Sequence, residues 1–218
     1  MKKKIFDCIT FFNSNHLFEI RFHTLKDIVD YFVICEANTT HTGERKKYNF
    51  KLNKWKKYKD KIIYIKVKNI KKIRLNQKNK FELIKKQIEF ISNGLIKADK
   101  NDLIILSDVD EIPDLNKLSQ YDKNKYAVFS QKMFMYKLNF LNLKENNWHG
   151  SKICLKKNLK SPQWLRSLKF KEYPFWRIDK IRNLQVIKDG GWHFSYLQTP
   201  ENISKKIQSF AHGEFNQS

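Results

Sequence analysis

The sequence predicts an α/β fold with a mostly parallel sheet flanked by helices, followed by an antiparallel C-terminal part. Three observations carry this prediction. Short apolar runs rich in β-branched and aromatic residues recur at residues 4–13, 31–37, 61–67 and 102–107. Stretches with helical spacing of apolar side chains separate several of these runs. From residue 126 onward, aromatic and polar residues alternate over short segments divided by Gly and Pro.

The first part of the chain alternates between strand and helix patterns. Residues 4–13 (KIFDCITFFN) are almost continuously apolar, as in a strand covered on both faces. Residues 14–30 predict a helix, because apolar side chains are spaced by four, three and four at Phe18, Phe22, Leu25 and Val29. A second strand is expected at 31–37 (YFVICEA), a polar loop at 40–48 and a third strand at 61–67.

A long amphipathic helix is predicted over residues 79–98. Its apolar stripe consists of Phe81, Ile84, Ile88, Ile91 and Leu95. Residues 102–107 (DLIILS) form the fourth expected strand, and the alternating segment 126–143 predicts antiparallel strands. Thr199 and Pro200 suit the N-cap and first position of a final helix.

Length and cysteine content set further limits. A chain of 218 residues fits one domain with a sizeable core, and we assign it to a single domain over 1–218. The three cysteines, Cys8, Cys35 and Cys154, are widely separated and form no CxxC pair. They therefore indicate neither a zinc site nor a disulfide framework, and they favour a reducing compartment.

The charge balance is strongly basic, with 44 Lys and Arg against 22 Asp and Glu and a net charge of +22. This excess indicates either a compositional bias towards Lys, Asn and Ile or a surface for polyanions. Lysines are spread throughout and no nucleic-acid-binding motif is recognisable, so we expect no nucleic-acid partner. No run approaches the roughly 18 apolar residues that span a membrane, although a basic surface allows peripheral membrane contact.

An acidic cluster ends the most apolar strand, in residues 101–114 (NDLIILSDVDEIPD). Asp108, Asp110 and Glu111 follow the apolar run directly. Ligands of open parallel sheets bind beyond the carboxyl ends of the strands. Two carboxylates two residues apart point the same way on an extended chain, and hard oxygen donors suit Mg²⁺ or Mn²⁺. The alternative is an acidic turn that caps a following helix.

A second polar segment lies at residues 189–215 (DGGWHFSYLQTPENISKKIQSFAHGEF). Gly190 and Gly191 permit a close backbone approach. His193, beside Trp192, is either a packed core histidine or a ligand.

Four segments together resemble glycosyltransferase family 17: FDCITFFN, FEIRFHTLKDIVDYFVICEANTTHTGERKKYNF, ILSDVDEIP and GGWHFSY…ISKKIQSFAHGEF. The similarity runs in order from about residue 4 to 215. The best-known members of the family add the bisecting N-acetylglucosamine of N-glycans. The resemblance implies a GT-A-like, Rossmann-like fold and inverting transfer from a nucleotide sugar, with UDP-GlcNAc as the expected donor. The nucleotide-sugar half would then be about 1–114 and the acceptor half about 115–218.

The resemblance also implies roles for individual residues. Asp108 and Asp110 match the family's Asp-x-Asp motif, and His193 matches the histidine of its GWH block. By similarity, Asp110 would hold a divalent metal, Mn²⁺ or Mg²⁺, on the donor diphosphate, and Asp108 would bind the ribose or a metal-bound water. His193 would complete the metal shell.

Further candidates surround this set. Phe11, Asn13 and Glu36 follow the first two strands, where such folds hold the nucleoside, and Trp192 is the preferred stacking residue for a sugar. The other aromatic candidates are Trp148, Trp176 and Tyr196, and candidates for stabilising the leaving diphosphate are Arg45, Lys46, Arg166 and Arg177. Inversion also requires a general base, for which the sequence offers Glu111, Glu145, Asp179 and Glu214 without choosing among them.

The sequence departs from the eukaryotic members of the family, which carry a membrane anchor and stem. From this difference we expect a cytoplasmic protein similar to bacterial or viral relatives, acting on another surface glycan. The alternatives are a basic nucleic-acid-binding protein and an inactive relative that only binds glycans. A different phosphoryl or nucleotidyl transferase lacks support, because no GxxxxGK[ST] loop is present.

Overall fold

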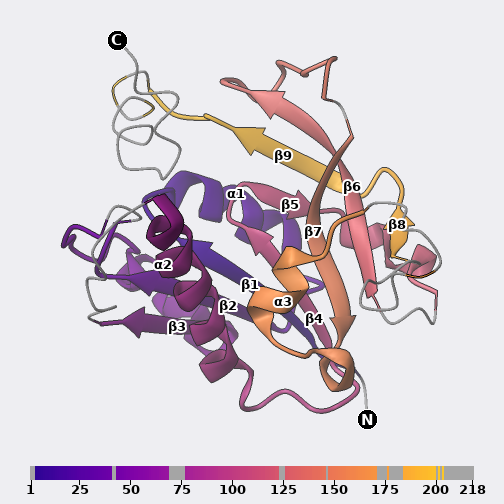
Figure 1. Cartoon of the computed structure of the whole chain (residues 1–218), viewed down its shortest axis with the longest axis horizontal. Coiled ribbons are helices and arrows are strands. Elements are labelled where there is room, and N and C mark those ends of the chain that lie inside the picture. Colours follow the sequence, from indigo (N-terminus) through magenta and orange to yellow (C-terminus); the bar gives the residue numbers. More distant parts are fainter. Residues whose placement is uncertain are drawn as a thin grey trace.

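The computed structural model describes residues 3–40, 43–68, 77–122, 126–145, 147–170, 176, 184–199, 201 and 203. Within these residues a single nine-stranded mixed sheet forms the centre of the molecule (Figure 1). Its strands follow the order β3-β2-β1-β4-β7-β6-β9-β5, with β8 paired to β6.

The first four strands of this order are parallel. They are β1 (Ile5–Phe11), β2 (Tyr31–Ala37), β3 (Ile62–Val67) and β4 (Leu103–Asp108). β1 pairs with both β2 and β4, and β2 pairs with β3. The predicted parallel sheet is therefore confirmed, and the carboxyl ends of all four strands meet at one edge.

The remaining strands make the mixed part of the sheet. They are β5 (Glu111–Pro113), β6 (Tyr126–Met135), β7 (Trp148–Leu155), β8 (Gln185–Ile187) and β9 (Gly191–Ser195). β7 runs antiparallel to β4 and β6, as expected for the second half. β8 and β9 instead pair in parallel with β6, and β9 pairs antiparallel with β5. The result is a mixed α/β sheet with a parallel first half and an antiparallel part, as the sequence predicted.

Helical segments cover the sheet, and the two α-helices predicted over 14–30 and 79–98 are shorter than expected. They are α1 (Asn15–Leu25), η1 (Leu52–Lys61), α2 (Gln77–Glu89), η2 (Phe90–Leu95), η3 (Leu115–Gln120), η4 (Lys156–Asn158) and α3 (Pro162–Ser167). The helix expected over 79–98 changes to a 3-10 segment at Phe90. Gly94 lies in that segment, where an added Cβ would stand 2.4 Å from Val33, so the glycine allows close packing on β2.

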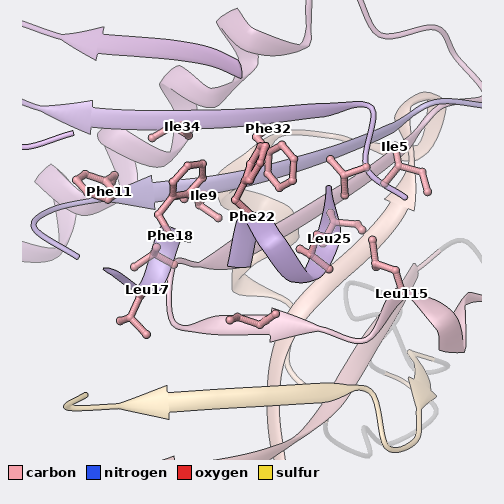
Figure 2. Packing of buried hydrophobic residues seen from close by; sticks show 14 of the residues in the cluster. Ile5, Ile9, Phe11, Leu17, Phe18, Phe22, Leu25, Phe32, Ile34 and Leu115 are labelled. Atoms are coloured by element: carbon pink, nitrogen blue, oxygen red, sulfur yellow. The ribbon is translucent and has the colours of Figure 1, made fainter. Parts of the chain in front are cut away.

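Two apolar clusters fill the two faces of the parallel strands. On one face, Ile9 and Phe11 of β1 pack with Phe18 and Phe22 of α1 (Figure 2). On the other face, Phe6 and Cys8 pack with residues of α2, η2 and α3. Side chains of β1 thus alternate between the two clusters, as the pleat of a strand requires.

Three other sequence-based expectations concern single features. All three cysteines are buried and free. The amide of Ile203 donates to the carbonyl of Thr199 at 2.9 Å, and the rest of the predicted final helix lies outside the described residues. In the part of the chain that the structure describes, no helix has the length and apolar character needed to cross a membrane.

Candidate active site

The acidic cluster and the GWH block meet at the carboxyl edge of the parallel strands. β4 ends at Asp108, whose register partner is Thr10 of β1, and β5 begins at Glu111. In the β5–β9 pair, Glu111 stands opposite His193. The Nε2 atom of His193 lies 4.0 Å from Oδ1 of Asp110. Four of the predicted site residues, Asp108, Asp110, Glu111 and His193, therefore lie together.

Gly191 makes this junction possible. Its φ of +123° favours glycine, and an added Cβ would lie 2.2 Å from the carbonyl oxygen of Ile112. The close backbone approach that the sequence predicted for the Gly pair is therefore present at Gly191.

Glu111 orients the acidic turn from within the protein. Its carboxylate is buried and accepts the amide of Asp108 at 3.0 Å and the indole N–H of Trp148 at 2.9 Å. Gly150 leaves room for this carboxyl group, since an added Cβ would stand 2.8 Å from its Cδ atom. These contacts support a positioning role, whereas the predicted role of Glu111 as general base stays a prediction.

Two cations lie beside the acidic turn. Arg166 forms an ion pair with Asp108 and lies 3.8 Å from Oε1 of Glu111. Desolvation works to raise the pKa of Asp108, but the charge and hydrogen bond of Arg166, together with the charges of His193 and Lys152, outweigh it, and the net pKa is lowered. Lys152 of β7 is buried, and burial together with the like charge of Arg166 lowers its pKa to about 8. Asp108 is thus held ionised next to a guanidinium group.

A buried ion pair holds the backbone of the acidic turn. The sequence did not predict this pair. Arg21 of α1 and Asp7 of β1 have no exposed side-chain surface, and they are joined by contacts of 2.7 and 2.5 Å. The same guanidinium donates to the carbonyl oxygens of Glu111 at 2.5 Å and of Asp108 at 3.3 Å. Arg21 therefore ties the backbone of the acidic turn to the first strand and first helix.

The tryptophan that adjoins the site in space is Trp148. Its ring lies 4.7 Å from that of His193, with an angle of 32° between the planes. Trp192 packs against the core cluster that surrounds α1. Neighbouring residues of a strand point to opposite faces, so Trp192 and His193 face different sides of β9. The predicted contact of Trp192 with the sugar stays a prediction, and Trp148 is the better placed aromatic residue.

Glu36 at the end of β2 is fully buried and bonded to its own chain. Its carboxylate accepts bonds from the amides of Asn49 and Phe50 at 2.7 and 3.0 Å and from the hydroxyl of Tyr64 at 2.7 Å. Lys46 forms an ion pair with it at 2.5 Å. Glu36 therefore positions the loop after β2, and its direct contact with a nucleoside stays a prediction.

The other candidates fall into three groups. Phe11 is buried in the core, and Asn13 is exposed just beyond β1. Glu145 and Trp176 are exposed. Asp179, Glu214 and Arg177 lie outside the described residues.

The donor set partly fits a divalent metal. Among the residues that the structure describes, no three His, Cys, Asp or Glu side chains are grouped as metal ligands. The Nε2 atom of His193 nevertheless faces Oδ1 of Asp110, and the buried Nδ1 atom of His193 has no hydrogen-bond partner among the residues that the structure describes. Mg²⁺-type sites commonly use one or two protein ligands and complete their shell with substrate phosphates. The pair fits such a site.

Comparisons with known proteins identify the family of the chain. The human Beta-1,4-mannosyl-glycoprotein 4-beta-N-acetylglucosaminyltransferase is 24% identical over 241 aligned residues, which cover 93% of this chain and 43% of the human sequence. This chain thus spans less than half the length of that relative. The solved structure of the inositol-1-phosphate CTP transferase from T. maritima aligns over 97% of both chains, with a TM-score of 0.42 and 13% identity. The sequence profile of Glycosyltransferase family 17 matches residues 1–217, and the chain belongs to this family.

Proposed function

We propose that the protein is a metal-dependent inverting glycosyltransferase that moves N-acetylglucosamine from UDP-GlcNAc to a hydroxyl group of a glycan. The observation that carries the proposal is the grouping of Asp108, Asp110 and His193 with Arg166 at the carboxyl edge of β4. Family membership supports sugar transfer, and the name of the human relative supports N-acetylglucosamine as the sugar.

In this proposal, Asp110 and His193 hold the metal. A bound divalent ion would neutralise charge on the donor diphosphate. Asp108 orients the donor ribose or a water on the metal, and its ion pair with Arg166 keeps it ionised. Glu111 and Trp148 fix the geometry of this turn through their mutual hydrogen bond.

Arg166 stabilises the leaving group. Its guanidinium group already lies beside Asp108, so donor diphosphate bound at the turn would be within its reach. A planar guanidinium group can donate two parallel bonds to phosphate oxygens. Such a donor stabilises the negative charge that develops on UDP as the glycosidic bond breaks.

The acceptor hydroxyl loses its proton to a carboxylate in an inverting transfer. Both oxygens of Glu111 already accept bonds from the protein, which favours the exposed Glu145 over Glu111 among the described candidates. Asp179 and Glu214 lie outside the described residues and stay candidates.

A transfer assay tests the proposal. The protein is incubated with UDP-GlcNAc, Mn²⁺ and a panel of oligosaccharide acceptors, and the anomeric configuration of the product is determined by NMR. We expect a β-linked product from the α-linked donor, and no product when EDTA is present. An α-linked product, or UDP release from a different nucleotide sugar only, would contradict the proposal.

A further inference from the structure

A hairpin follows β6 and is folded against the end of β9. The amide of Met135 donates to the carbonyl of Phe140 at 2.9 Å, and the amide of Asn142 donates to the carbonyl of Met133 at 2.8 Å. Its tip begins at Tyr136. In Figure 1 this segment lies at the edge of the molecule, beyond the β6 label.

Two strained tyrosines fix the orientation of the hairpin. Tyr136 and Tyr196 have φ values of 65° and 56°, which bulky residues rarely adopt. Their rings stack with centroids 6.0 Å apart, and the amide of Tyr136 donates to the carbonyl of Ser195 at 3.0 Å. Such backbone strain persists only where the surrounding contacts hold it. The hairpin is therefore fixed on β9 and presents its tip in one direction.

The tip exposes apolar side chains between lysines. Leu138, Phe140 and Leu143 are exposed by 53%, 61% and 79%. Lys137 and Lys144 are exposed beside them, and Glu145 is the one acidic residue between positions 132 and 145. Leaving large apolar groups in water without a partner is unfavourable, so this arrangement indicates a docking surface.

We propose that the hairpin tip, residues 136–144, docks on an anionic lipid surface by inserting Leu138, Phe140 and Leu143 between the headgroups. Apolar side chains next to lysines are typical of segments that lie in the membrane interface. Each lysine near an anionic bilayer adds attraction, in keeping with the net charge of +22. A stable protein interface needs about 800 Å² and some 20 residues on each partner, more than one hairpin tip supplies.

Docking would bring the candidate active site to the lipid surface. Met133, at the base of the hairpin, is the register partner of His193 in the β6–β9 pair. An acceptor glycan carried by a lipid would then reach the site from the membrane. The inference does not depend on the proposed sugar transfer, because lipid binding is measured without donor or acceptor.

Cosedimentation with vesicles tests the inference. We expect the protein to bind vesicles of phosphatidylcholine with phosphatidylglycerol, and binding to weaken at high salt. The double variant Phe140→Ser/Leu143→Ser should bind at least about tenfold more weakly, since losing one large apolar side chain already changes partition by about that factor. The matched control is Phe90→Ser/Ile96→Ser, which removes a 40% and an 82% exposed apolar residue elsewhere and should bind like the original protein.

A second measurement does not rely on weakened binding. Because the native cysteines are buried, Leu143→Cys can be labelled selectively with an environment-sensitive dye, and Ile96→Cys serves as its control. We expect a blue shift on vesicle addition for the label at position 143 and none at position 96. The proposal would be overturned if the protein did not bind vesicles, or if the two double variants lost binding equally. It would also be overturned if the hairpin substitutions changed only self-association, as measured by size-exclusion chromatography.

Discussion

Arg21 and Asp7 form an ion pair with no exposed side-chain surface, and Arg21 also holds the backbone carbonyl of Glu111. The acidic turn that carries Asp108 and Asp110 is thereby anchored to β1 and α1. Removing one partner of a buried pair leaves an uncompensated charge, which costs about 3–5 kcal/mol.

The variant Arg21→Met should therefore lower the free energy of unfolding by about 3–5 kcal/mol, as measured by urea denaturation. The matched control is Lys54→Met, which breaks the exposed ion pair between Lys54 and Glu19 of α1. This substitution should cost at most about 1 kcal/mol. Equal effects of the two substitutions would contradict the anchoring role of Arg21.

Glu36 should control the order of the loop after β2. Glu36→Gln replaces one acceptor oxygen with an NH₂ group that cannot accept the bonds to that oxygen. These are either the bonds from the amide of Asn49 and from Lys46 to Oε1, or those from the amide of Phe50 and the hydroxyl of Tyr64 to Oε2. We expect a loss of about 1–3 kcal/mol in unfolding free energy. Hydrogen exchange should become faster at Asn49 and Phe50 and stay unchanged at Leu103, whose amide bonds to Lys4. Unchanged exchange at both loop amides would refute this role.

Lys152 should make stability depend on pH. Burial, aided by Arg166, lowers the pKa of Lys152 to about 8 in the folded protein, against an ordinary value of 10.5. Between these values the unfolded chain binds the extra proton, so the penalty that this group places on folding diminishes as pH rises from 8 to 10.5. Over this pH range, the unfolding free energy of the original protein should rise by up to about 3 kcal/mol relative to that of Lys152→Met. Parallel stability curves for the two proteins would contradict this.

Arg166 should act on the leaving group. Arg166→Met should lower kcat about a hundredfold, as loss of a donor to a developing negative charge does in other enzymes. Arg166→Lys keeps the charge without the paired donors, and we expect it to recover only part of the activity. Steady-state kinetics with varied donor provide the measurement, and Lys56→Met, an exposed cation on η1, is the control. Full activity in Arg166→Met would exclude the role.

The sequence predicted the parallel strands and the grouping of Asp108 and Asp110 with His193. The apolar runs predicted the strands, and parallel strands bring their carboxyl ends to one edge. The grouping with His193 was implied by the resemblance of the GGWH block to the family. The exact bounds of the helices were harder to predict. The apolar stripe of residues 79–98 continues past Phe90, where the structure changes to a 3-10 segment in which Gly94 packs closely on β2.

The supporting residues of the site depend on contacts between distant segments. Asp7 interrupts an apolar strand, and Arg21 stands on the apolar stripe of α1 between Phe18 and Leu25. Two opposite charges on facing apolar surfaces are a signal for a buried pair, although neither residue alone indicates it. Which tryptophan lies beside His193 could not be predicted without knowing how the strands pair. Trp192 is its neighbour in sequence, and for that reason it lies on the opposite face of β9.

The central claim is that Asp110 takes part in metal-dependent donor binding, and thermal unfolding with UDP-GlcNAc, with and without Mn²⁺, tests it most directly. At a donor concentration about a hundredfold above Kd, binding adds about 2.7 kcal/mol, which raises Tm by about 5–10 °C. We predict this rise only when Mn²⁺ and donor are both present, its absence in Asp110→Asn, and its retention in Asp60→Asn, an exposed aspartate of η1. An equal rise without Mn²⁺, or in Asp110→Asn, would contradict the account.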